Sequence, residues 1–93
     1  MAEANYKSSL GISLYVDPDG ITITGNAKRS ETIVEFESAY DFEEFVQKHI
    51  DCTDISFDSE FCQFFAYAKT EERAMKFIQD IEQHFEKVKK MLD

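Results

Sequence analysis

The chain has 93 residues, of which 43% are hydrophobic, three are glycine and one is proline, so it is not a disordered, collagen-like or low-complexity sequence. A chain of this length buries about 65% of its accessible surface on folding, which suffices for one core without disulfide bonds. We therefore expect a single domain over residues 1–93, with residues 1–5 as a flexible N-terminal arm. The formal charge of −9 disfavours direct binding to nucleic acids or anionic membranes, because both require a basic protein surface.

Negative charge concentrates in the middle third of the sequence. Residues 31–60 contain ten acidic side chains and one lysine, whereas acids and bases are balanced in residues 1–30 and 61–93. A basic protein surface is the natural complement of such a region. The alternative is that the charge only keeps the chain in solution.

The first third of the chain predicts three β-strands. Apolar and polar residues alternate over residues 10–16, which is the pattern of a half-buried strand. Residues 17–20 read Asp-Pro-Asp-Gly, which is typical of a type I turn, so residues 21–24 are expected to return as a second strand. A third strand is expected over residues 31–37.

Two amphipathic helices follow. Asp41 is the expected N-cap of the first, with Tyr40 placed to pack on Phe45, and the helix is expected to end near Asp51. Thr70 is the expected N-cap of the second helix, whose apolar face continues for more than five turns.

Residues 55–68 are expected to be extended. Residues 58–60 either divide this segment into two strands or form a bulge within one. In its second half, Cys62, Phe64, Ala66 and Ala68 are assigned to the face that packs against the helices, because the small alanines allow close approach. Phe61, Phe65 and Tyr67 then face outward, together with Tyr15 and Ile33.

The sequence therefore predicts an α+β fold in the order β-β-β-α-β-α. It has an antiparallel sheet of four strands, or five if residues 55–68 form two, with both helices on one face. Residues 61–78 resemble the second half of ferredoxin-like domains such as RNA-recognition modules. These modules bind RNA with basic residues beside exposed rings, whereas acidic residues precede the rings here, so the resemblance carries no RNA-binding function across.

No catalytic or metal site is predicted. His49, Cys52, Cys62 and His84 are zinc-ligating residue types, but only the first two are closely spaced and the chain has no Cys-x-x-Cys pair. We expect no metal, no cofactor and reduced cysteines, with Cys62 in the core. Because the glycines form no phosphate-binding loop and no nucleophile has an evident base, the chain is not expected to be an enzyme.

The outward rings and the acidic segment together favour a protein-binding site, because rings bordered by carboxylates attract Arg and Lys side chains. The candidate partner-binding residues are Tyr15, Glu35, Glu37, Asp41, Glu43, Glu44, Phe61, Phe65 and Tyr67.

The predicted function is that of a non-enzymatic inhibitor, decoy or adaptor that docks on a basic surface of a larger partner. A phage or regulatory protein that blocks nucleic-acid machinery would have these properties. The alternative is a small-molecule binding or sensing domain that forms a homodimer through its sheet face. No apolar run approaches the roughly 18 residues of a membrane span, and the first ten residues lack a signal-peptide pattern, so a cytoplasmic location is expected.

Overall fold

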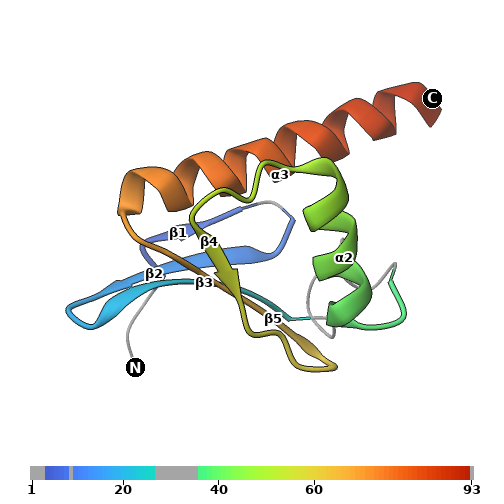
Figure 1. Ribbon diagram of the computed structural model, residues 1–93. Helices are drawn as coiled ribbons and strands as arrows, with labels where there is room; N and C mark the ends of the chain where they lie inside the picture. The colour runs from blue at the N-terminus through green and yellow to red at the C-terminus, as the bar shows by residue number, and fades with distance from the viewer. Residues whose placement is uncertain (1–3, 9, 27–35, 93) are drawn as a thin grey trace.

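The computed structural model describes residues 4–8, 10–26 and 36–92, which form a sheet covered on one face by two helices (Figure 1). The strands are β1 (Tyr6–Lys7), β2 (Ile12–Asp17), β3 (Gly20–Asn26), β4 (Ile55–Phe57) and β5 (Gln63–Ala68). The helices are α2 (Ala39–His49) and α3 (Glu71–Leu92). All strand pairs are antiparallel and the spatial order is β1-β2-β3-β5-β4. The predicted α+β fold is confirmed, with five strands in the order βββαββα.

Pairing with the sheet begins closer to the N-terminus of the sequence than expected. The backbone N–H of Asn5 donates to the carbonyl oxygen of Leu14 at 2.7 Å, and its Oδ1 accepts from the N–H of Val16 at 2.9 Å. Tyr6 then lies opposite Leu14 in β1. Asn5, the last residue of the expected arm, thus bonds to β2. A two-residue strand is too short to show a periodic pattern in sequence.

The segment before α2 also differs from the prediction. Residues 31–35 of the expected third strand lie outside the described residues, and Phe36, Glu37 and Ser38 form bends rather than a strand. The N-cap of α2 is Ser38, not Asp41: its Oγ accepts the backbone N–H of Asp41 at 3.3 Å. Serine is as good an N-cap as aspartate, so the helix begins earlier and Asp41 lies in its first turn.

Residues 58–60 separate two strands, which settles the alternative left open by the sequence. Thr70 caps α3 as predicted, since its Oγ1 accepts the backbone N–H of Arg73 at 3.1 Å. The acidic first turn of α3 complements the positive end of its dipole.

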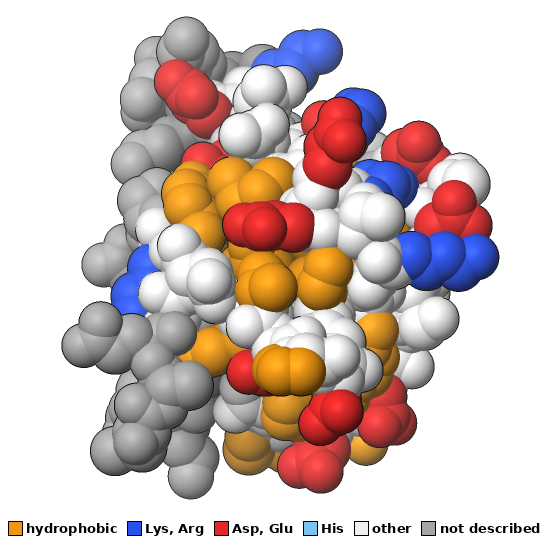
Figure 2. Space-filling view, turned by 90° about the vertical axis from the view of Figure 1, so that its left-hand side faces the viewer, with side chains coloured by type: hydrophobic (Ala, Val, Ile, Leu, Met, Phe, Trp, Pro, Cys, Tyr) orange, Lys and Arg blue, Asp and Glu red, His pale blue; other side chains and the backbone are white. Residues whose placement is uncertain are grey.

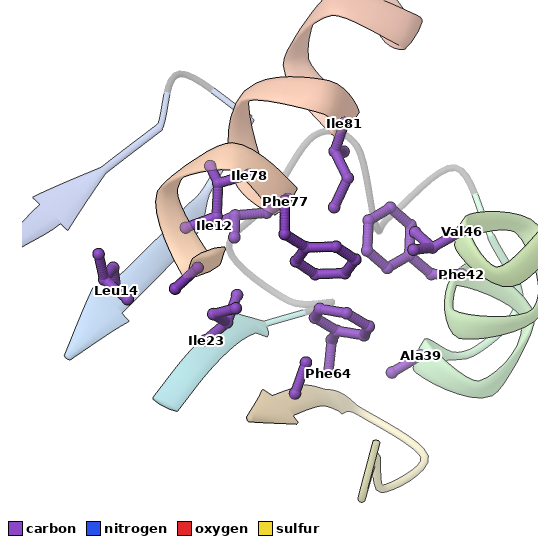
Figure 3. Packing of buried hydrophobic residues seen from close by; sticks show 12 residues of the cluster. Ile12, Leu14, Ile23, Ala39, Phe42, Val46, Phe64, Phe77, Ile78 and Ile81 are labelled. Atoms are coloured by element: carbon purple, nitrogen blue, oxygen red, sulfur yellow. The ribbon is translucent and has the colours of Figure 1, made fainter. Parts of the chain in front are cut away.

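The core lies between the sheet and the helices (Figure 3). Its centre is a group of rings, in which Phe42 of α2 meets Phe64 of β5 edge to face with centroids 5.0 Å apart. Among the described residues, the hydrophobic side chains with no exposed surface are Ile12, Leu14, Ile23, Ala39, Phe42, Val46, Phe64, Ala66, Ala74, Phe77, Ile78 and Ile81. We call the sheet face that carries Ile12, Leu14, Ile23, Phe64 and Ala66 the inner face.

Candidate functional site

The opposite face of the sheet, which we call the outer face, carries Ser13, Tyr15, Thr22, Thr24, Phe65 and Tyr67. Strand register arranges these side chains in two rows. Ser13, Thr24 and Phe65 form one row across β2, β3 and β5, which continues to Lys7 of β1. Tyr15, Thr22 and Tyr67 form the other, which continues to Ser56 of β4.

The assignment of Phe65 and Tyr67 to the outward face agrees with their exposure. Phe65 is partly exposed and Tyr67 is 39% exposed, whereas Phe64 and Ala66 between and beside them are fully buried. Tyr15 lies two strands from Tyr67, about 10 Å away, with the short Thr22 between them. The outer face is therefore a shallow hydroxyl-lined surface with rings at two positions along its width.

Carboxylates border the rings at the β4 edge. The backbone N–H of Asp58 donates to the carbonyl oxygen of Phe65 at 3.1 Å, so the two residues lie opposite one another across the ladder. Asp54, at the other end of β4, forms an exposed ion pair with Lys69, with Oδ1 and Nζ 3.6 Å apart. Asp54 and Asp58 were not among the predicted site residues. The alternation of polar Ser56 and Asp58 with apolar Ile55 and Phe57 is the sequence signal for Asp58, whereas Asp54 lies in the turn before β4 and has no such signal.

A shallow cavity of about 360 Å³ lies beside these residues, at the end of the β4–β5 ladder. Its lining consists of Asp54, Ile55, Ser56, Tyr67, Ala68 and Lys69. The cavity thus combines an exposed ring, a hydroxyl group and a weak, solvent-exposed ion pair. Such a combination can hold a side chain with an apolar stem and a charged end.

The predicted acids of α2 lie elsewhere. Glu35 is outside the described residues, and Glu37 is exposed just before the helix. Asp41, Glu43 and Glu44 belong to α2, which packs on the inner face through Phe42 and its neighbours. The structure therefore does not bring these carboxylates to the rings of the outer face. Glu44 instead pairs with Lys48 one turn along the same helix, with Oε1 and Nζ 3.2 Å apart.

Phe61 and Cys62 belong to neither sheet face. They form the bend between β4 and β5, which Glu60 and Gln63 close with reciprocal backbone hydrogen bonds of 2.8 and 3.4 Å. Cys62 is exposed, so its predicted core position is wrong: the strand alternation begins at Gln63. Phe61 is 62% exposed, and its carbonyl oxygen accepts the first N–H of α2, that of Ala39, at 2.8 Å.

Arg73 of α3 holds the loop that leads into β4. Its Nε donates to the carbonyl oxygen of Thr53 at 2.9 Å, and its Nη2 donates to that of Asp51 at 2.8 Å. The Asp51 carboxylate accepts from the Thr53 hydroxyl at 2.7 Å and from its N–H at 3.0 Å, which lowers the pKa of Asp51. Burial raises the pKa of the neighbouring Cys52 thiol, so this cysteine is a poor nucleophile.

The two histidines meet where α2 and α3 pack together. The rings of His49 and His84 are stacked with centroids 5.0 Å apart, and Phe45 contacts both. Burial, together with the nearby charges of His49 and Lys87, lowers the pKa of His84. Among the described residues, no three His, Cys, Asp or Glu side chains are grouped to hold a metal ion.

On the side of the molecule shown in Figure 2, hydrophobic side chains gather around an acidic one and are bordered by further acidic side chains. Within the described part of the chain, no helix has both the length and the apolar character needed to cross a bilayer. Comparison with protein-family models, curated proteins and solved structures finds no match to this chain.

Proposed function

We propose that this chain is a non-enzymatic protein-binding module, an inhibitor, decoy or adaptor, whose outer face docks on a basic surface of a larger partner in the cytoplasm. One observation carries the proposal: the partly exposed ring of Phe65 and the exposed ring of Tyr67 lie on the sheet face that neither α2 nor α3 covers, with Asp58 opposite Phe65 and Asp54 at the same edge. Rings and carboxylates side by side favour Arg and Lys side chains of a partner.

The two kinds of side chain have different roles in this proposal. The net charge of −9 attracts a basic partner over a distance, which raises the association rate and makes it depend on salt. Phe65 and Tyr67 are the anchors, because large rings at the centre of a contact contribute most of the binding free energy. The threonines between the rings keep the surface low, so a partner can approach the backbone of the sheet.

The test compares two variants for their partners in a cell extract. Phe65→Ser with Tyr67→Ser removes both rings from the outer face, whereas Tyr40→Ser removes an exposed ring from α2. Far-UV circular dichroism first establishes that both variants are folded. We expect the double variant to lose the proteins that the wild-type chain retains, and Tyr40→Ser to keep them. Retention should decrease between 50 and 300 mM salt, because exposed charges are screened over about 10 Å at 0.1 M.

Two results would overturn the proposal. One is an unchanged set of retained proteins in the double variant. The other is a stable dimer in light scattering that dissociates on Phe65→Ser with Tyr67→Ser, because a second copy would then cover the outer face. The second result would favour the dimeric small-molecule domain, and native mass spectrometry of the dimer would detect a retained ligand.

A further inference from the structure

The sheet has an open edge at β4. This strand pairs with β5 on one side, and within the described part of the chain no strand pairs with its other side. Since Asp58 bonds to β5 through its backbone, alternation directs the N–H and C=O of Phe57 away from β5. The N–H of Ile55 already donates to the carbonyl oxygen of Cys52 at 3.0 Å. The edge thus offers one donor and its neighbouring carbonyl groups to an added strand.

The charge around this edge selects what can pair with it. Residues 51–60 contain four carboxylates, Asp51, Asp54, Asp58 and Glu60, and no lysine or arginine. Carboxylates beside an edge strand prevent pairing between two copies of the same edge, because like charges would meet. The same carboxylates attract a strand that carries basic side chains.

The cavity fixes where such a side chain would lie. In an antiparallel addition, the residue of the incoming strand opposite Ser56 points to the outer face, and Tyr67 lies beyond Ser56 in the same row. The cavity wall also contains Asp54, whose partner Lys69 is 79% exposed and held at 3.6 Å. A guanidinium group can displace this ammonium group and bind the carboxylate in two places while stacking on the ring.

We propose that the partner, in the function proposed above, binds by adding an extended basic segment antiparallel to β4, with an arginine side chain in the cavity beside Tyr67 and Asp54. Backbone pairing supplies affinity, and the cavity supplies the preference for arginine. This inference rests on the proposed function but specifies the edge of the sheet, not only its face.

The probe is a capped nine-residue peptide in which threonine alternates with arginine. In the proposed register, threonine residues lie opposite Phe57 and direct their N–H groups to β4, whereas arginine N–H groups point away. Methylating the amide nitrogens of the central threonines should therefore abolish binding, and methylating those of the central arginines should preserve it. Amide exchange of Phe57 should slow roughly tenfold or more at saturating peptide, whereas that of Ser56, already paired with β5, should not change.

Protein variants test the charge contribution with the peptide unmodified. Asp54→Asn with Asp58→Asn should raise the Kd about two- to fivefold for each exposed pair lost. Asparagine also tolerates the positive φ of 63° at position 54, so the loop is preserved. Glu37→Gln with Glu44→Gln removes the same charge from the α2 side and should leave the Kd nearly unchanged.

Equal binding of both methylated peptides, with Phe57 exchange unaffected, would overturn strand addition. If Asp54→Asn with Asp58→Asn still weakened that binding, a basic segment would contact the face without pairing, and the proposed function would stand. If the unmodified peptide did not bind at all, strand addition would be wrong, and the comparison of Phe65→Ser/Tyr67→Ser with wild type would decide the proposed function separately.

Discussion

The two faces of the sheet contain rings from the same strand, β5, with opposite surroundings. Phe64 points to the inner face, has no exposed surface and meets Phe42 edge to face at 5.0 Å. Tyr67, on the same strand but on the outer face, is 39% exposed and lies between Thr22 and Ser56. A partly exposed ring contributes less to stability than a fully buried one. The contrast separates residues that hold the fold from residues available to a partner.

The largest expected effect compares these two rings directly. Phe64→Ala should lower the free energy of unfolding by about 3 to 5 kcal/mol, because it leaves a cavity at the centre of the core. Tyr67→Ala should lower it by about 1 kcal/mol or less, since only strand propensity and partial burial are lost. Urea unfolding followed by circular dichroism measures both. Comparable losses in the two variants would show that the outer face belongs to the core.

The inner face was predictable from sequence because it depends on simple periods. Ala66 and Phe64 alternate with Phe65 and Tyr67, and the assignment of faces in β5 follows from that alternation alone. The apolar stripe of α3 identified its buried side in the same way. The alternation misplaced Cys62 because the strand begins only at Gln63, and a strand boundary has no periodic signature.

The acidic border of the candidate site was harder to predict. Proximity along the sequence suggested the α2 acids, yet that helix covers the inner face. Asp54 and Asp58 lie beside the rings of β5 only because β4 pairs with β5, and this pairing depends on a hairpin that the sequence left open. Long-range register therefore determines the site, whereas local pattern determines most of the elements.

The next largest effect on the free energy of unfolding concerns the contact between helix α3 and the loop that leads into the sheet at β4. Arg73, on the covering helix α3, binds the carbonyl groups of Asp51 and Thr53 just before β4, and its side chain is 17% exposed. Arg73→Met keeps the apolar stem and should lower the free energy of unfolding by about 1 to 2 kcal/mol. Two hydrogen bonds from a charged donor are lost, while removal of the buried Nη1, which has no partner, offsets part of the cost.

Lys76→Met is the matched control for this prediction. Lys76 lies one turn further along α3 and pairs with Asp80 at 3.2 Å on the exposed surface, so its loss should cost about 0.5 kcal/mol or less. Hydrogen exchange adds a local measurement: amides of β4 should exchange faster in Arg73→Met than in Lys76→Met. Equal exchange in the two variants would mean that Arg73 does not position the edge strand.

The smallest effect tests the contact between α2 and α3, the two helices that cover the inner face. Burial, followed by the nearby His49 and Lys87, holds the pKa of His84 below its ordinary value of 6.5. The unfolded chain therefore binds a proton at a pH where folded His84 remains neutral, and stability is lost as pH falls from 6.5 toward the lowered pKa.

The measurement compares urea midpoints of wild type and His84→Gln at pH 7.5 and 5.5. Partial neutralisation of the net charge of −9 reduces self-repulsion in both proteins, so the difference between them isolates the histidine. We expect wild type to lose stability relative to His84→Gln on acidification. Midpoints that shift in parallel would show that the stacked rings separate freely in the folded state. The contact between α2 and α3 at the histidines would then be weaker than the packing of Phe42 on Phe64 at the centre of the core.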